Sequence, residues 1–272
     1  MKKLFLVIMA LSLLLVTGCG KESLSSQEQG SGYTVVDARG KKITFASAPK
    51  RIVCLNYSAT DILTDLIPTE RIIATDMWAR EEDLSNCYEK LKGIPVCENN
   101  PEQIMKFNPD LVILTEGRAN ELADTLDSVG VKTCVLRQPK TIQEIPDYIK
   151  IVGEVADTKA AADSLAEKVA AYIKASAGGQ KIESVLLIHP NGGIGQKGSM
   201  PASICEACNI ENLAAKYDFP QSSYLSKEQI IAMNPQRIIV LDWSFGGQHK
   251  NAEIRNCLLY TSPSPRDRSL SR

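Results

Sequence analysis

The sequence predicts an α/β protein of two three-layer α/β/α lobes with mostly parallel sheets, joined by one long α-helix. Three observations support this fold class. Short apolar segments alternate with amphipathic helical segments in both halves of the chain, which is typical of parallel sheets covered by helices. One long helical pattern without a strand lies between the halves. The same helix–turn–strand phrase also occurs twice, as PEQIMKFNPDLVIL at 101–114 and KEQIIAMNPQRIIVL at 227–241.

The first eighteen residues have the pattern of an export signal. Two lysines precede an apolar core at 4–16, and small residues then lead to Cys19. A membrane-spanning helix needs about 20 apolar residues, and this core is shorter. VTGC resembles a bacterial lipobox, which predicts a signal peptide at 1–18, a lipid on Cys19 and a polar tether at 19–32. We therefore expect an exported chain that its lipid anchors to the periplasmic or outer face of the cytoplasmic membrane.

Residues 33–155 are expected to form the first lobe. YTVVDARGKKITF at 33–45 alternates apolar and polar residues around a turn and predicts a hairpin. Helices are predicted at 56–66 and at 118–130, where Gly130 occupies the usual place of a terminating glycine. Strands are predicted at RIVCL (51–55), RIIATDMW (71–78), DLVILTEG (110–117) and VKTCVL (131–136). This alternation predicts a parallel sheet with helices on both faces.

The middle of the chain, 156–180, is expected to be the linking helix. The helical pattern runs from 158 to 177, with Asp157 as its N-cap candidate and Leu165, Val169 and Tyr172 on one stripe. The second lobe, 181–256, is predicted to contain the strand SVLLIH, one helix over 201–216, the repeated helix and the strand RIIVL. A doubly wound lobe needs further strands after these, so this lobe is expected to be incomplete.

The last sixteen residues, 257–272, change abruptly to Ser, Pro and Arg. A disordered basic tail is one interpretation. We favour the other, that CLLYTSPSPRD is an adapter-derived, non-native sequence.

The repeated phrase places an acid at the same point of two helices. Glu102 and Glu228 lie 126 positions apart, each at the second position of a helix that Asn100 or Ser226 caps. A glutamine three residues after the cap predicts a capping box, and an acid in the first turn interacts favourably with the helix dipole. Each glutamate could therefore be a helix-start residue only. Equivalent positions in two lobes favour a second hypothesis, that a partner with two basic sockets binds both.

The chain resembles a known family in three places. DARGKKITFASAPKRIVCLNYSATDIL at 37–63, the two Glu-Gln-Ile phrases and the mid-chain helix resemble class III periplasmic binding proteins, the substrate-binding proteins of iron-siderophore, haem and cobalamin ABC importers. The resemblance covers residues 33 to about 256. It implies a receptor that binds a metal-chelate complex between its lobes and delivers it to a permease dimer with its ATPase. In that family a glutamate of each lobe docks on permease arginines, which implies this role for Glu102 and Glu228.

The resemblance also implies that the ligand contacts loops after the strands, where open parallel sheets generally bind ligands. A tryptophan there would give a flat wall for a macrocycle or catecholate, and an arginine would meet anionic groups. The alternative for each tryptophan is a packing anchor. The candidate ligand-binding residues are Tyr57, Ser58, Met77, Trp78, Arg80, Arg118, His189, Asn191, Trp243 and Phe245.

Other motifs are interpreted as structural. GIGQKG at 193–198 matches a dinucleotide-binding string, but no helix opens inside it, and a cleft loop is the better hypothesis. Cys205 and Cys208 have zinc or redox spacing without a second pair, which favours two core thiols. Export permits disulfides, and Cys87 with Cys97 is the most natural local pair, although buried free thiols are also expected. His189 as a haem ligand stays open.

The composition excludes little but points away from nucleic acid. A net charge of −1 gives no bulk attraction to nucleic acid or to an anionic membrane. We therefore expect a binding protein, with no catalytic residue, no resident cofactor and no bound metal ion of its own. The alternatives are an exported hydrolase using Ser58, His189 and Asp242, which lacks a nucleophile-elbow motif, and a surface or redox lipoprotein.

Overall fold

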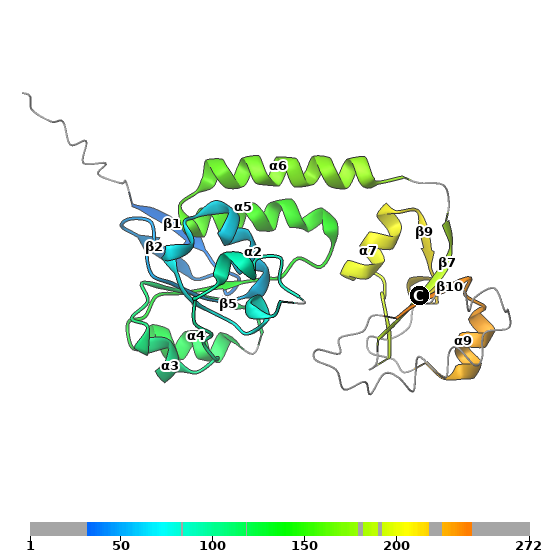
Figure 1. Cartoon of the computed structure of the whole chain (residues 1–272), viewed down its shortest axis with the longest axis horizontal. Coiled ribbons are helices and arrows are strands. Elements are labelled where there is room, and N and C mark those ends of the chain that lie inside the picture. Colours follow the sequence, from blue (N-terminus) through cyan, green and yellow to red (C-terminus); the bar gives the residue numbers. More distant parts are fainter. Residues whose placement is uncertain are drawn as a thin grey trace, which may run out of the picture. The chain divides into compact units, whose positions relative to one another are not determined.

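The computed structural model describes residues 32–82, 84–117, 119–178, 182–189, 192–217 and 225–240 (Figure 1). Cys19, the predicted signal peptide and the predicted tail lie outside these residues. Within the described residues, no helix combines the length and the apolar character that crossing a membrane requires.

The first elements form the predicted hairpin. β1 (Tyr33–Val36) pairs antiparallel with β2 (Lys42–Phe45), so that Tyr33 lies opposite Phe45 and their rings stack with centroids 4.9 Å apart. The turn between the strands contains Gly40 at φ +78, a left-handed conformation that glycine adopts without steric cost.

A four-stranded parallel sheet follows, in the order β4-β3-β5-β6. Its strands are β3 (Ile52–Leu55), β4 (Ile72–Thr75), β5 (Leu111–Thr115) and β6 (Thr133–Leu136). Residues 95–97 continue it past β4, because the Thr75 N–H donates to the Pro95 carbonyl (3.1 Å) and the Cys97 N–H donates to the Thr75 carbonyl (2.8 Å). The four predicted strands are confirmed.

Helices cover both faces of this sheet, as the sequence predicts. Alternate strand residues face two separate apolar clusters. α2 (Tyr57–Leu66) and α5 (Ile145–Ala156) pack on one cluster, and α3 (Pro101–Lys106) and α4 (Ala119–Ser128) pack on the other. Short 3-10 turns occupy Thr69–Arg71, Trp78–Arg80, Glu89–Leu91 and Ile142–Glu144.

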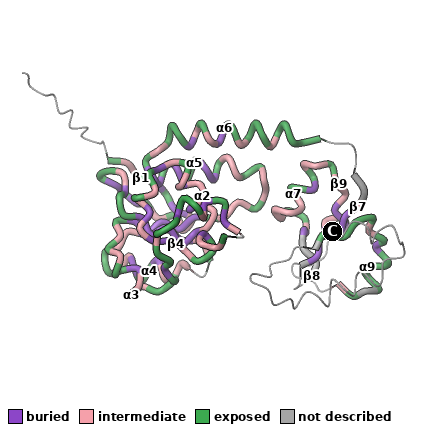
Figure 2. The backbone as a smooth tube through the Cα atoms, viewed as in Figure 1, coloured by how far each residue is buried: buried purple, intermediate pink, exposed green. Residues whose placement is uncertain are grey.

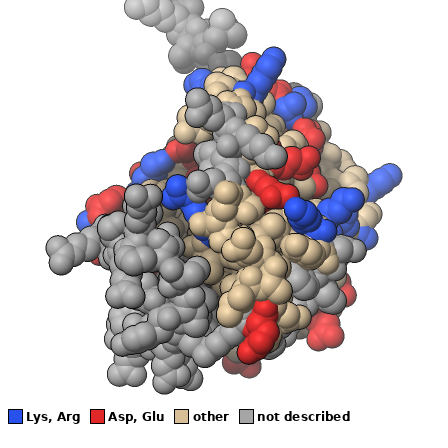
Figure 3. Space-filling view, turned by 90° about the vertical axis from the view of Figure 1, so that its right-hand side faces the viewer, with Lys and Arg blue, Asp and Glu red and all other residues tan. Residues whose placement is uncertain are grey.

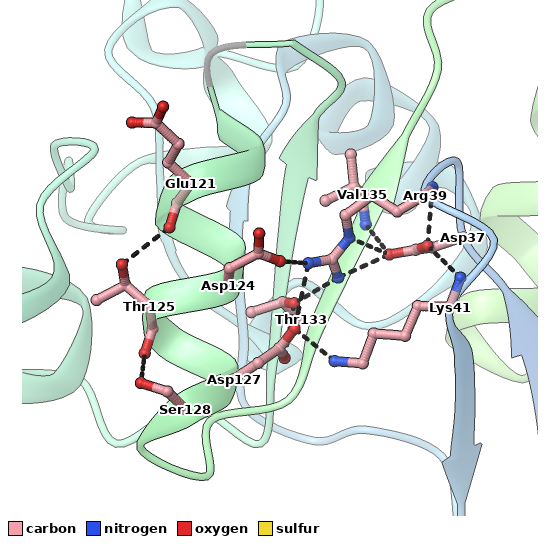
Figure 4. A network of polar contacts seen from close by, with 10 residues as sticks. All are labelled: Asp37, Arg39, Lys41, Glu121, Asp124, Thr125, Asp127, Ser128, Thr133 and Val135. Carbon is pink, nitrogen blue, oxygen red and sulfur yellow. Dashed lines mark hydrogen bonds and ion pairs between the residues drawn. The ribbon is translucent and has the colours of Figure 1, made fainter.

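An ion-pair network ties the hairpin turn to this sheet (Figure 4). The Arg39 guanidinium bonds Asp37 (Nε to Oδ2, 2.8 Å), Asp124 (2.9 Å), Asp127 (3.2 Å) and the Thr133 hydroxyl (2.9 Å). The Asp37 side chain is fully buried and also accepts backbone N–H groups of Arg39, Lys41 and Val135. One guanidinium therefore joins the turn, α4 and β6.

α5 and α6 (Lys159–Ser176) form a helical hairpin, and two expectations need correction. Asp157, expected as the N-cap of the long helix, instead ends α5 in a left-handed conformation (φ 60), and Thr158 is the N-cap. Tyr172, expected on the apolar stripe, is 74% exposed, because Ala162 and Ala166 form the buried face together with the half-buried Leu165 and Val169. Figure 2 shows α6 largely exposed along its length.

The helices of this hairpin approach closely at Gly153. A Cβ atom added there would lie 2.1 Å from the Ala162 Cβ. We expect Gly153→Ala to destabilise the protein by about 1–3 kcal/mol through overpacking, although alanine is the better helix former by about 1 kcal/mol. Urea unfolding measures the change. Ala162→Gly in the same chain should restore part of the loss, whereas a stabilised single variant would contradict the close approach.

The second sheet has β7 (Ile182–His189) at its centre. β10 (Arg237–Val240) and β9 (Ile210–Asn212) pair with it in parallel, and β8 (Gly192–Ile194) pairs antiparallel. The single helix expected over 201–216 is wrong. Asn209 takes a left-handed conformation (φ 56) and divides it into α7 (Met200–Ala207), β9 and α8 (Leu213–Lys216). α9 (Lys227–Met233) precedes β10, as predicted.

Candidate functional site

The ends of four parallel strands form the first candidate site. β4, β3, β5 and β6 run in the same direction, so the residues that follow them lie at one edge of the sheet, which we call the carboxyl edge. These residues are 76–80, 56–58, 116–117 and 137–138. Open parallel sheets bind ligands at this edge, at loops that the strands hold in place.

Met77 and Trp78 are large apolar side chains that remain exposed at this edge, by 50% and 44%. Asp76 fixes the turn that carries them, because its carboxylate accepts the Ala79 N–H at 3.0 Å, inside the 3-10 turn Trp78–Arg80. Burial raises the pKa of Asp76. An exposed indole on a fixed turn is suited to contact a flat, apolar ligand.

Tyr57 and Ser58 begin α2, whose first turn is capped by Asn56. The Tyr57 hydroxyl donates to the Leu84 carbonyl at 2.9 Å, and burial raises the pKa of this tyrosine. Tyr57 therefore holds the loop after Trp78 against the sheet. Ser58 is half-buried beside it, at the start of the helix.

Arg80 is directed into the protein by the residues that follow it. Its Nη1 donates to the carbonyls of Leu91 and Ile94, the second at 3.0 Å, and its guanidinium lies 5.7 Å from the centre of the Tyr88 ring. The sequence predicts that the Arg80 guanidinium meets anionic groups of a ligand. In the structure it binds these two carbonyls of the protein instead. A contact between Arg80 and a ligand stays a prediction.

Asn56 connects three elements at the carboxyl edge, and sequence reasoning missed its partners. Its Oδ1 accepts from the Ala59 N–H (3.0 Å), Gln138 Nε2 (2.9 Å) and the Tyr148 hydroxyl (3.1 Å). The side chain is buried, and within the described residues its Nδ2 has no hydrogen-bond acceptor. Gln138 and Tyr148 therefore fix the end of β3 relative to β6 and α5.

Glu116 and Arg137 form an ion pair after β5 and β6. Two parallel bonds join them, Nε to Oε2 at 2.8 Å and Nη2 to Oε1 at 3.0 Å, and the Arg137 guanidinium lowers the pKa of Glu116. Arg137 directly follows the strand VKTCVL. The sequence predicts ligand contacts in loops after strands, and the same search after this fourth strand would have found Arg137.

The repeated phrase forms the second candidate site, on α3 and α9, which we call the paired helices. Asn100 accepts the N–H groups of Glu102 and Gln103, and Ser226 accepts the Gln229 N–H at 3.2 Å. The capping box is complete in α9. In α3 it is not, because the Gln103 side chain bonds Glu98 instead.

Both paired helices end and dock on their sheets in the same way. Asn108 and Asn234 take left-handed conformations with φ 47 and φ 46, and each precedes a proline. Asp110 donates its N–H to the Arg51 carbonyl (3.0 Å) and accepts the Arg51 N–H (3.0 Å). Gln236 makes the same two contacts with Ser184, at 3.1 and 2.7 Å.

These contacts give the two copies the same local structure as well as the same sequence pattern. β5 pairs in parallel with β3, and β10 pairs in parallel with β7, the first strand of its sheet. Glu102 and Glu228 are both exposed at the second position of their helices. The chain therefore presents one acidic helix start twice, in two similar surroundings.

The sequence matches the periplasmic binding protein family profile over residues 52–257, more than half of the chain. The chain belongs to the periplasmic binding protein family. Among curated relatives, it is 25% identical over 214 residues to a cobalamin-binding protein of Halobacterium salinarum, covering 76% of this chain and 58% of the relative. It is 24% identical over 176 residues to an uncharacterized ABC transporter substrate-binding lipoprotein of Bacillus subtilis, covering 60% and 54%. The chain thus spans little more than half the length of these relatives.

Solved structures share the fold of this periplasmic binding protein. A possible iron-binding (periplasmic solute-binding) protein from Staphylococcus epidermidis aligns with a TM-score of 0.60 at 22% identity, over 73% of this chain and 79% of that one. The periplasmic heme-binding protein from Roseiflexus sp. RS-1 aligns with a TM-score of 0.62 at 24% identity, over 71% and 76%. The predicted fold class is confirmed. The predicted domain boundaries stay predictions.

Five of the ten predicted ligand contacts of this periplasmic binding protein have side chains outside the described residues. Arg118, Asn191, Trp243 and Phe245 lie outside the described residues. The backbone of His189 ends β7 opposite Gly192, and its side chain is not described. Tyr57, Ser58, Met77, Trp78 and Arg80 lie together at the carboxyl edge, and among them Met77 and Trp78 are the exposed ones.

The motifs interpreted as structural have structural partners. A Cβ at Gly195 would lie 2.8 Å from Leu187 Cδ1, and the Gly195 carbonyl accepts Asn212 Nδ2 at 2.7 Å, so this glycine allows a close approach of the backbone. Cys205 is buried and Cys208 half-buried, both as free thiols.

The cysteines show no disulfide within the described residues, and Cys87 and Cys97 are buried free thiols, which is the second of the two alternatives that the sequence left open. The Cys87 thiol instead contacts the Ser85 hydroxyl at 3.2 Å. The described part of the chain also holds no cluster of three or more His, Cys, Asp or Glu side chains that could bind a metal ion.

Proposed function

We propose that this chain is the extracytoplasmic receptor of an ABC importer, which binds an iron(III)-siderophore, haem or cobalamin-type complex and delivers it to a permease dimer. Membership of the periplasmic binding protein family supports the receptor role. The names of its relatives, which include a cobalamin-binding protein and a heme-binding protein, support this class of ligand. The lipid on Cys19 would anchor the receptor to the membrane.

The observation that carries the proposal is the equivalence of the paired helices. Two acids in matching positions suit a partner that presents the same basic socket twice, as a dimeric permease does. On the face drawn in Figure 3, lysine and arginine are interspersed with aspartate and glutamate, and the whole sequence has a net charge of only −1. Local geometry therefore has to supply the specificity.

The ligand wall of the receptor is assigned to Met77 and Trp78, with Trp243 and Phe245 expected to contribute from the second lobe. Exposed apolar side chains at the carboxyl edge would contact the flat part of a macrocycle or catecholate. Arg118 and His189 are proposed to meet its polar or metal-bearing part. Titration of the protein with haemin, cyanocobalamin and a ferric catecholate, followed by tryptophan fluorescence, tests the ligand class. Absence of binding to all three would contradict it.

Trp78→Ala is expected to weaken binding of the ligand found in that titration by about 1–3 kcal/mol, by analogy with the stacking of bases on aromatic side chains. Calorimetry measures the affinity without relying on the removed fluorophore. Tyr172→Ala is the matched control, because Tyr172 is a 74% exposed aromatic residue on α6. Equal affinities for the wild type and the Trp78 variant would assign Trp78 to packing alone.

A further inference from the structure

An exposed apolar residue accompanies the acid on each of the paired helices. Met105 is 41% exposed and Ile231 is 63% exposed, and they lie 126 positions apart, as the two glutamates do. Each follows its glutamate by three residues. Residues three apart on a helix are neighbours on the same face, so an acid and an apolar side chain stand side by side in both copies.

The opposite faces of the paired helices explain why these side chains remain outside. Ile104 is fully buried in the cluster beneath α3, and Ile230 is half-buried in the cluster beneath α9. These isoleucines anchor the helices to their lobes, and the next residue along points away from the core. Single exposed apolar residues are common on protein surfaces. Here, however, the exposed apolar residue recurs at the same position of a repeated phrase, beside the same acid. Packing in the core of either lobe does not account for this recurrence, because both side chains lie outside it.

We infer that Glu102 with Met105, and Glu228 with Ile231, form two copies of one docking patch, and that the partner is a protein with two equivalent subunits. Each subunit would offer a basic side chain beside an apolar recess. The inference rests on the proposed receptor function and adds the apolar half of the contact. An acid that docks next to a buried apolar group is partly removed from water, which strengthens its attraction to a cation.

The two halves of the patch differ in their response to salt. Screening weakens a charge pair at an interface, with a Debye length of about 8 Å at 0.15 M ionic strength. Burial of apolar surface is little affected by such screening and instead produces a negative heat-capacity change on binding. Substitutions of the acid and of the apolar residue are therefore separable in one titration series.

The test measures the affinity of the intact receptor for the permease–ATPase complex from the same organism. The complex is purified in detergent, and the affinity is measured over a range of salt concentrations. Met105→Ser and Ile231→Ser should each weaken affinity about tenfold with an unchanged salt dependence, as expected for the loss of a buried apolar side chain. Glu102→Gln and Glu228→Gln should weaken affinity and also flatten the salt dependence.

Matched controls exist in both halves of the chain. Val129 is 58% exposed after α4 and Ile204 is 45% exposed on α7, so Val129→Ser and Ile204→Ser remove comparable side chains away from the paired helices. These controls should bind as the wild type does. Thermal melting should be nearly the same for all serine variants, because each replaces an exposed residue.

The outcomes separate this inference from the proposed function. If the wild type does not bind the permease complex, both are overturned. If the glutamine variants bind weakly while Met105→Ser and Ile231→Ser bind normally, the receptor function stands and the apolar half of the patch is rejected. Equal loss in the controls, or a change of the receptor's own oligomeric state in the Met105 and Ile231 variants, would also reject it.

Discussion

Arg39→Ala should lower the free energy of unfolding by about 3 kcal/mol, towards the lower end of the range for breaking a buried ion pair. The substitution leaves the Asp37 carboxylate, whose side chain has 0% exposure, without its cation. Three backbone N–H groups still donate to this carboxylate, which moderates the loss. Urea unfolding measures the change.

Two further variants identify the cause of that loss. Lys41→Ala removes a 38% exposed cation from Asp127 and should cost less than about 1 kcal/mol. Arg39→Ala combined with Asp37→Asn should recover part of the stability, because no buried charge is then left unpaired. If Arg39→Ala lowers the free energy of unfolding by no more than Lys41→Ala does, the network contributes no more to stability than an exposed ion pair.

Lowering the pH into the strongly acidic range should reduce the difference in free energy of unfolding between Arg39→Ala and the wild type. Burial alone would raise the pKa of Asp127, but its bonds to Lys41 and Thr133 and the charge of Arg39 outweigh burial and lower it. An acid with a lowered folded-state pKa contributes stability above its unfolded-state pKa and loses that contribution as the pH falls through the folded-state value. The network therefore stabilises the protein at neutral pH and less so at strongly acidic pH.

Changing Glu102 and Glu228 to Gln should reduce import in cells that carry the transporter, and the double variant should be worse than either single one. Truncating one partner of an interfacial charge pair costs about 2–5 kcal/mol, since the other charge remains unpaired. Stability should fall only by the helix-dipole contribution, about 0.3–1 kcal/mol per site. Ligand affinity of the free receptor should not change, because neither residue belongs to the carboxyl edge.

Glu121→Gln is the matched control for this experiment. Glu121 is an exposed acid in the first turn of α4, so its replacement removes a similar dipole interaction without touching the paired helices. Normal import by both Glu102→Gln and Glu228→Gln, with only their melting temperatures shifted, would assign these acids to helix initiation.

The strands of the parallel sheet could be predicted because buried parallel strands are continuous apolar runs. RIVCL and VKTCVL contain such runs, and the structure buries all four residues of β3 and of β6. α5 was missed although its pattern is amphipathic, with Tyr148, Ile149 and Val152 buried on one side. Its proline at the second position and Gly153 obscured it. Proline is tolerated in a first helical turn, and the glycine is needed for packing against α6.

The candidate site could be predicted only at the level of which loops it uses. The sequence places Trp78 and Arg80 in the same loop, but the direction of Arg80 depends on the backbone around Leu91 and Ile94, whose carbonyls bind the guanidinium. Such long-range partners leave no periodic signal. The paired helices were recognisable because capping groups, the Asn-Pro turn and the following strand are all encoded locally.

In the proposed receptor, the backbone bridge at Thr75 connects the turn proposed to contact the ligand with the helix proposed to dock on the permease. Thr75 ends the strand that leads into the Met77–Trp78 turn, and through its two hydrogen bonds it also holds residues 95–97, just before the helix that carries Glu102. A loop graft intended to give this receptor a new cargo would replace 76–80. Under the proposed function, we expect such a chimera to keep its contact with the permease only if the grafted loop leaves the Thr75 N–H and carbonyl in place, so that the two proposed binding specificities are coupled through this backbone.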